Sequence, residues 1–407
     1  MLQENKSKDI NVYKKNLRRI LIETILTSIG AGFCISTINI FWNQIGMNQT
    51  AIGLTQMMFT VVICVMDIPM GYVADRFNRK ALNVIGDIGV ALTFLMYALA
   101  NNMYVVIISE SLLGLFMAMT NGVDQSFIKY NCNKIDDKGI LFKKINVRIN
   151  VWKYIVTLLV MIIGGFIAKY NLRLAIGMSF VPYMIGGIIA LGIHDLAGKR
   201  KVKHKNPVKD MVHSVKEIVN DSKARAYMLS YITGKEITHA QIWVLTPLLI
   251  MVGVPIEIVS LGWVMSEIMK IIGAKVSEKM IRFKTSNKYI IPAVIEILWM
   301  IILVINTNIV TVWLFALNGL IVGINSGLLV TPLQEATKDE VQASVMSVAS
   351  TGARLLYIPL VYFVNYLGNI KLQLALVGVI TVFLPASICV YVMLKKLEKQ
   401  DSKNWNS

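Results

Sequence analysis

The stretch Asp67-Ile68-Pro69-Met70-Gly71-Tyr72-Val73-Ala74-Asp75-Arg76-Phe77-Asn78-Arg79-Lys80 is a charged turn between two long apolar runs. The apolar residues on both sides indicate that the turn joins two helices too hydrophobic for water. Gly71 permits close helix approach because it lacks a Cβ atom. Asp75 and Arg79 follow at one-turn intervals, so the acid and the base can face each other.

The composition of the whole chain places this turn in a membrane protein. Of the 407 residues, 55% are hydrophobic and 16% are charged, and the mean hydropathy is +0.60. In soluble domains about a quarter of the residues are charged. The lower charged fraction of this chain therefore predicts a polytopic membrane protein. The net charge of +17 does not indicate nucleic-acid binding, because the basic residues are spread between apolar spans.

The apolar runs predict the number of spans. A helix needs about 20 apolar residues to cross a hydrocarbon core of about 30 Å. We therefore predict an all-α membrane protein with 12 transmembrane helices in two six-helix bundles. The predicted spans are 17–42, 50–74, 81–100, 103–130, 145–168, 172–194, 226–252, 256–281, 289–305, 309–334, 341–366 and 372–394.

Basic residues predict the orientation of these spans. Of the 41 Lys and Arg residues, 33 lie in the two tails and in alternate connections on one side, and the opposite side carries only Lys169, Arg173 and Lys371. Cytoplasmic connections collect Lys and Arg, so we predict that both termini are cytoplasmic. The predicted parts are a tail at 1–16, a first bundle at 17–194, a basic cytoplasmic linker at 195–225, a second bundle at 226–394 and a tail at 395–407.

The pattern G-x-x-x-D-R-x-x-R-K in the opening turn resembles the loop signature between the second and third spans of the major facilitator superfamily of secondary transporters. It departs at Asn78, where the family usually has Gly, but Asn also tolerates a left-handed backbone. The resemblance implies a two-bundle fold whose halves rock around a central cavity. We also predict that the protein works as a monomer.

An acid near the cytoplasmic end of the fourth span often joins the charged residues of this signature in the superfamily, and Asp124 matches that position. The resemblance therefore implies a conformational gate and not a substrate site. The alternative is that Asp124 only caps the end of its helix. The predicted gate residues are Asp67, Gly71, Asp75, Arg76, Arg79, Lys80 and Asp124.

The acid-Ile-Pro-x-Gly start of the signature looks like a subset of bacterial exporters related to drug and tetracycline transporters. Two features depart from proton antiporters. The fourth span has Glu110 and Ser111 where an Arg is common, and the fifth span has Gly164-Gly165 without the Gly-Pro pair. These departures leave the direction of transport open.

Charged residues inside the predicted spans are candidates for function. Each one costs about 2.5–3.5 kcal/mol on insertion scales, so it needs a partner, a water-filled cavity or a role. Lys235, Glu236 and His239 lie about 14–20 Å into the seventh span, and Glu236 and His239 share a helix face. Histidine titrates in the pH range of proton coupling. The alternative is an internal ion pair that only rigidifies the helix.

Other charges at membrane depth suggest pairings. Glu267 and Lys270 are one turn apart and are expected to neutralise each other. We expect Glu110 to pair with Lys153, and Arg354 with Glu236 or Glu267. Glu296, on the ninth span, is interpreted as mainly structural. The candidate substrate and proton pathway is Glu110, Lys153, Glu236, His239, Glu267, Lys270 and Arg354.

The sequence contains no P-loop, no nucleophile elbow and no zinc-protease motif, so an ATP-driven pump is not indicated. The chain has no sizeable soluble domain to house an active site, so we predict that the protein is not an enzyme. The four cysteines are scattered, and we predict no metal or cofactor. The predicted function is proton-coupled efflux of a drug, an antibiotic or a peptide antibiotic across a bacterial inner membrane. Its partners are then a small-molecule or small-peptide substrate, protons and membrane lipids. The alternatives are a nutrient importer or facilitator of the same fold, and a non-transporting membrane receptor or scaffold.

Overall fold

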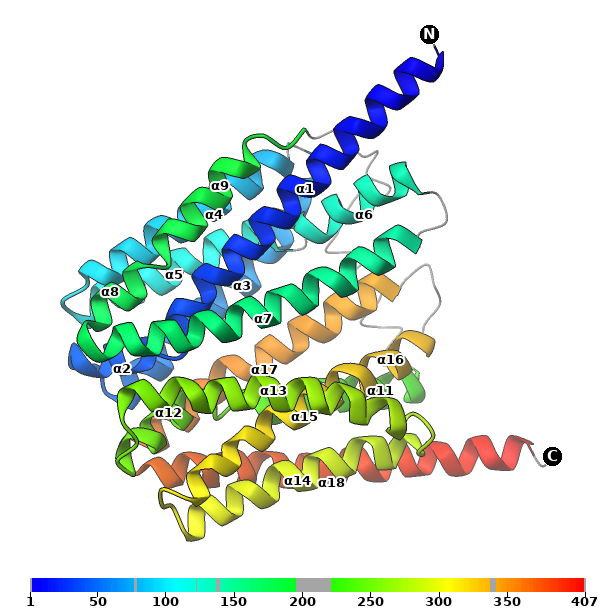
Figure 1. Cartoon of the computed structure of the whole chain (residues 1–407). Coiled ribbons are helices and arrows are strands. Elements are labelled where there is room, and N and C mark those ends of the chain that lie inside the picture. The colour runs from blue at the N-terminus through cyan, green and yellow to red at the C-terminus, as the bar shows by residue number, and fades with distance from the viewer. Residues whose placement is uncertain are drawn as a thin grey trace. The chain divides into compact units, whose positions relative to one another are not determined.

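The computed structural model describes residues 2–76, 79–121, 123–136, 140–194, 221–336 and 342–405. Every regular element in these ranges is a helix (Figure 1). The prediction of an all-α chain is therefore confirmed for this part of the protein. The linker at 195–220 lies outside the described residues.

The first half of the chain supplies the helices from α1 to α9. Several of them begin at a polar cap, as where the side chain of Asn102 accepts a hydrogen bond from the backbone of Val105. The helices are α1 Leu2–Ile35, α2 Ile38–Gln44, α3 Gln49–Arg76, α4 Arg79–Leu99, α5 Met103–Thr120, α6 Val123–Ile135, α7 Ile140–Tyr170, α8 Leu172–Gly177 and α9 Phe180–Ala190.

The second half supplies the helices from α11 to α18. Its strongest packing contacts join helices that are not successive in the chain, α13 with α15 and α14 with α18. The elements are α11 Ser222–His239, α12 Ile242–Met251, α13 Ile256–Met280, α14 Thr285–Ile305, the short 3-10 helix η1 Thr311–Phe315, α15 Ala316–Leu328, α16 Val330–Glu335, α17 Gln342–Ile370 and α18 Leu372–Trp405.

These bounds add three details to the sequence analysis. Helix α1 begins at Leu2, and α18 continues to Trp405, so the expected tails are helical over most of their length. Helix α11 begins at Ser222, inside the expected linker. The expected single span at 226–252 is broken into α11 and α12 at Ala240 and Gln241.

Nine helices in the described part are long and apolar enough to cross a membrane, and ten if the bent pair Ile10–Ile35 and Ile38–Gln44 counts as one span. The two remaining predicted spans correspond to the broken pair α11 and α12 and to α13. Helix α13 has 25 residues, which is long enough to span, but it carries Glu267 and Lys270 among other charges. The total of 12 spans stays a prediction.

The chain divides by its internal contacts into two compact units. The first comprises Met1–Met47 and Met58–Lys203, and the second comprises Asn48–Met57 and His204–Ser407. The first turns of α3 belong to the second unit because Gly53 lies against α17. A Cβ atom at Gly53 would lie 2.7 Å from the Cβ of Asn365, so a larger residue would push the two helices apart.

The second unit contains a tight helix pair, α13 and α15. A Cβ atom at Gly319 would lie 1.9 Å from the backbone oxygen of Ser266, and one at Gly323 would lie 2.1 Å from that of Lys270. Small residues at four-residue spacing let membrane helices approach to backbone contact. This pair forms a rigid wall beside α11, which also contacts α15.

Candidate functional site

Helix α11 presents the candidate site of the second unit, and polar contacts fix its position. The side chain of Asp221 caps the helix by accepting hydrogen bonds from the backbone of Lys223 and Ala224. Further along, the Thr233 hydroxyl lies 2.8 Å from the hydroxyl of Tyr289 on α14. These contacts set the rotation of α11, and with it the direction of Glu236 and His239.

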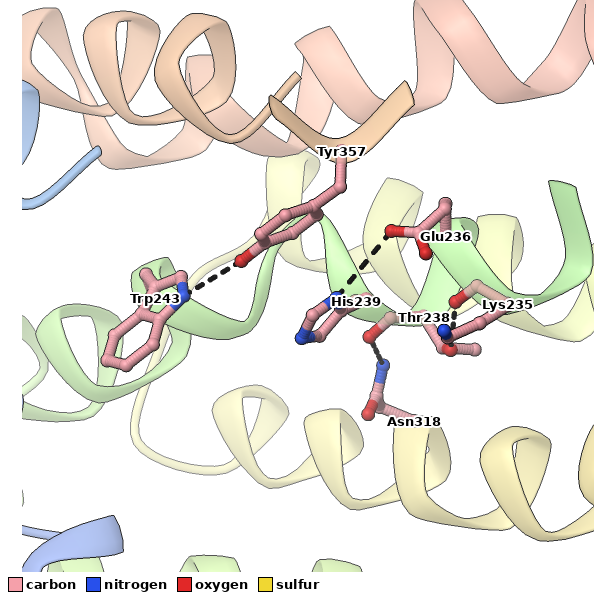
Figure 2. Close-up of polar contacts among 7 residues, drawn as sticks. All are labelled: Lys235, Glu236, Thr238, His239, Trp243, Asn318 and Tyr357. Carbon is pink, nitrogen blue, oxygen red and sulfur yellow. Dashed lines mark hydrogen bonds and ion pairs between the residues drawn. The ribbon is translucent and has the colours of Figure 1, made fainter. Parts of the chain in front are cut away.

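Glu236 and His239 form a close pair, as the sequence predicts. The Nδ1 atom of His239 lies 3.6 Å from Oε2 of Glu236 (Figure 2). The side chain of Glu236 is 2% exposed, whereas that of His239 is 45% exposed. No described residue forms a hydrogen bond with Glu236 Oε2, which is buried. The pair therefore joins a buried, incompletely satisfied carboxyl group to an accessible imidazole.

Two aromatic residues hold the imidazole in place. The ring of Tyr357, on α17, stacks on His239 with a centroid distance of 4.3 Å and an interplanar angle of 18° (Figure 2). Tyr357 is 3% exposed, and its hydroxyl accepts a hydrogen bond of 3.0 Å from Nε1 of Trp243 on α12. Helices α11, α12 and α17 thus meet at His239.

Cationic groups flank this pair. Tyr231, on α11, lies within electrostatic range of both Glu236 and Arg354, so the acid and the guanidinium share one neighbourhood. Lys235 precedes Glu236 on α11 and is half-buried. Its ammonium group makes no ion pair with the carboxylates that the structure describes. The site combines one buried acid, one imidazole and two cations.

A second buried acid, Glu296 on α14, has a different environment. Its Oε1 accepts hydrogen bonds of 2.6 Å from Nε2 of Gln241 and 2.9 Å from Nδ2 of Asn318. Its Oε2 accepts a hydrogen bond of 2.9 Å from Nε1 of Trp299. Gln241 occupies the break between α11 and α12, so this network ties the break to α14 and α15. The geometry agrees with the structural interpretation of Glu296.

The predicted gate is only partly visible. Oδ1 of Asp67 accepts a hydrogen bond of 3.3 Å from Nδ2 of Asn121. Arg79 opens α4 and is buried, and Lys80 is half-buried. The environments of Gly71, Asp75, Arg76 and Asp124 lie outside the described residues, as do Phe77 and Asn78. The gate therefore stays a prediction.

The other predicted pathway residues divide into two groups. Glu267 and Lys270 form the expected ion pair on α13. Glu110, on α5, is buried within electrostatic range of Cys34 and Tyr97, and Lys153 on α7 makes no ion pair with a described residue. The expected pair of Glu110 with Lys153 stays a prediction. Glu110 and Lys153 belong to the first unit.

Sequence reasoning missed Tyr357, Trp243, Gln241 and Asn318. Tyr357 follows Arg354 by three residues, so helical spacing placed it on the face of an already recognised charge. Polar amides inside apolar runs were the available signal for Gln241 and Asn318. Among the described residues, no group of three or more His, Cys, Asp and Glu residues is placed to hold a metal ion.

Comparisons with known proteins agree with this architecture. The chain is 24% identical over 177 residues to an uncharacterized MFS-type transporter of Methanocaldococcus jannaschii. This match covers 44% of the chain and 39% of that relative, so it spans less than half of either protein.

Two solved structures share the fold. The nucleoside transporter NupG has a TM-score of 0.76 at 14% identity and covers 94% of this chain and 99% of its own. A bacterial homolog of the human lysosomal transporter Spinster has a TM-score of 0.73 at 12% identity and covers 95% and 98%. The family model of the Major Facilitator Superfamily matches residues 20–359. The chain therefore belongs to the Major Facilitator Superfamily, as a multi-pass membrane transporter and not an enzyme.

Proposed function

We propose that this secondary transporter is a proton-coupled exporter of a small toxic compound, such as a drug, an antibiotic or a peptide antibiotic. It would act in the cytoplasmic membrane of a bacterium by alternating access. Glu236 carries the coupling proton, and His239 connects it to water. Family membership supports the transport class, and the geometry of the Glu236–His239 pair supports the proton.

The observation that carries this proposal is the buried Oε2 atom of Glu236, which lies 3.6 Å from an accessible imidazole and has no hydrogen-bond donor among the described residues. A buried carboxylate oxygen without a donor is costly. A proton on that oxygen removes the charge and supplies a donor hydrogen. A single proton therefore changes the electrostatics of the site strongly.

The charged groups beside Glu236 link its protonation to a conformational change. When Glu236 is ionised, it attracts Arg354 of α17 and the imidazolium form of His239 on its own helix. When Glu236 is protonated, that attraction between α11 and α17 is lost. A transporter couples two ligands when each changes the affinity for the other, by about 1–3 kcal/mol in typical cases. Loosening of α11 against α17 is the proposed means of coupling.

The direction and the substrate are tested together. A strain lacking the protein is screened with drugs, antibiotics and peptide antibiotics, and the compound that becomes more toxic is then used as the transport substrate. Inside-out vesicles that are acid inside should accumulate this compound. Accumulation with the opposite gradient requirement would instead indicate an importer.

Site variants separate transport from a receptor or scaffold role. Glu236→Gln and His239→Gln should abolish resistance at an unchanged protein level in the membrane. Glu267→Gln is the matched control, because Glu267 is a half-buried acid of the same unit that already pairs with Lys270. Full resistance with Glu236→Gln would contradict the proposed proton site.

A further inference from the structure

Two parts of the His239 ring have neighbours, one ring face and the edge that carries Nδ1. Tyr357 covers one ring face at 4.3 Å, and Nδ1 faces Glu236 at 3.6 Å (Figure 2). The side chain is nevertheless 45% exposed. The accessible part is therefore the opposite ring face and the edge that carries Nε2. An accessible, flat imidazole face is a surface on which another flat ring can stack.

The platform beneath this face is rigid. Tyr357 is buried, and its hydroxyl is held by the indole of Trp243. Two rings that are already stacked lose little rotamer freedom when a third ring is added. An aliphatic ligand would gain only apolar contact at this place, whereas a planar aromatic ligand would extend the stack.

Lys235 supplies a second recognition group one helical turn away. It lies four residues before His239 on α11, so the two side chains project from the same helix face with Cβ atoms about 5–6 Å apart. Lys235 is half-buried, and its ammonium group has no ion pair with a carboxylate of the described chain. A lysine at membrane depth marks a functional site by default.

We propose that the substrates are planar heteroaromatic acids. The ring system stacks on the open face of His239, and the carboxylate or phosphate group pairs with Lys235 one helical turn away. This inference rests on the proposed transport function and names the substrate class of the same site. Tyr357 and Trp243 are positioning residues, because they act through His239.

Three probes test the two recognition elements separately. Nalidixic acid is planar, heteroaromatic and acidic, quinoline is planar without the acid, and cyclohexanecarboxylate is acidic without a planar ring. Binding to the purified full chain in detergent is measured by titration calorimetry in the absence of any gradient. We expect nalidixic acid to bind more tightly than either of the others. Equal binding of the three probes, or no binding of nalidixic acid, would overturn the proposal.

Variants assign each element to its residue. Lys235→Met should weaken nalidixic acid about tenfold or more, in line with loss of a charged hydrogen bond, and leave quinoline unchanged. Tyr357→Leu should weaken both planar probes about 3- to 10-fold, in line with loss of an aromatic stack. Tyr362→Leu is the matched control, because Tyr362 belongs to another stacked pair, with Tyr366, on the same helix. An equal loss with Tyr362→Leu would count against a specific platform.

Further variants keep the stacking test informative if Tyr357→Leu does not fold. Tyr357→Phe retains the ring and loses only the hydroxyl group, so it should keep most of the binding. If Tyr357→Leu does not fold, His239→Ala and His239→Trp replace it. The Ala variant should lose planar selectivity, and the Trp variant should retain it. Loss in both, or retention in both, would overturn the stacking role.

Failure of this inference is distinguishable from failure of the proposed function. Proton movement is followed separately, in proteoliposomes that contain a pH-sensitive dye. Selective binding of nalidixic acid without proton movement would overturn proton coupling and leave the substrate class intact. Proton-driven transport of a compound without a planar ring would retain the coupling and overturn the substrate class.

Discussion

Glu236 and Glu296 are both buried acids of the second unit, but their surroundings differ. Glu296 receives hydrogen bonds from Gln241, Asn318 and Trp299, which satisfy both of its oxygens. Oε2 of Glu236 lies 3.6 Å from Nδ1 of His239 and has no hydrogen bond in the described part of the chain. The difference shows that burial alone does not identify a transport acid. The supply of donors separates a structural acid from a candidate proton site.

Glu296→Ala tests the structural side of this comparison. The substitution removes the acceptor of three buried donors, each of which costs about 1–3 kcal/mol when unpaired. Because the donors come from α14, from α15 and from the break before α12, we expect the free energy of unfolding to fall by about 3–5 kcal/mol in total. Thermal unfolding in detergent and the yield of monodisperse protein measure the loss. Wild-type stability would show that the network is dispensable.

Glu236→Gln tests the functional side. We expect gradient-driven transport to fall about 10- to 100-fold, because typical coupling free energies between two ligands lie in that range. The unfolding temperature should remain close to wild type, since no hydrogen bond to Oε2 is lost. A variant that loses stability as Glu296→Ala does would place Glu236 in the same structural class.

Asn318→Ala removes one of the three hydrogen-bond donors to Glu296. Nδ2 of Asn318 donates to Glu296 and also lies 2.7 Å from the backbone oxygen of Thr238 (Figure 2). Glu296 retains two donors in this variant, so we expect a loss of about 1–2 kcal/mol in the free energy of unfolding. Chemical denaturation monitored by tryptophan fluorescence measures it. Transport per folded molecule should remain near wild type, and a selective loss of transport would contradict a structural role.

Glu267→Gln provides the reference for a partly exposed charge. Its ion pair with Lys270 is 21–30% exposed, and such pairs contribute at most about 1 kcal/mol. We expect both the unfolding temperature and transport to change little. A loss of transport as large as that of Glu236→Gln, at normal stability, would indicate that the proton site lies on α13.

The sequence predicted the fold because hydrophobicity and charge act over whole spans. Apolar runs and the uneven distribution of Lys and Arg indicated helices, two halves and a membrane, and the turn at Gly71–Lys80 indicated the family. The break after His239 was missed, since Ala240 and Gln241 carry no Pro or Gly signal. Gln241 is held at this break by a hydrogen bond to Glu296, which is a contact between residues 55 positions apart.

The candidate site was only half predictable for a similar reason. Glu236 and His239 lie on one helix, so their three-residue spacing predicted that the two side chains are close together. Tyr357 and Trp243 come from other helices, and only the packing of α11 against α17 and α12 shows that they hold the imidazole. Pairs between helices, such as the expected pair of Glu110 with Lys153, depend on helix rotation and depth, which periodicity does not fix.

The protonation of Glu236 can be observed without knowledge of the substrate. Infrared difference spectroscopy on the purified protein, recorded as the pH is changed, detects the C=O stretch of a protonated carboxyl group. We predict a band that changes with pH in the wild type, is missing in Glu236→Gln, and persists in Glu267→Gln. A pH-dependent band of unchanged intensity in Glu236→Gln would contradict the assignment of the proton to Glu236.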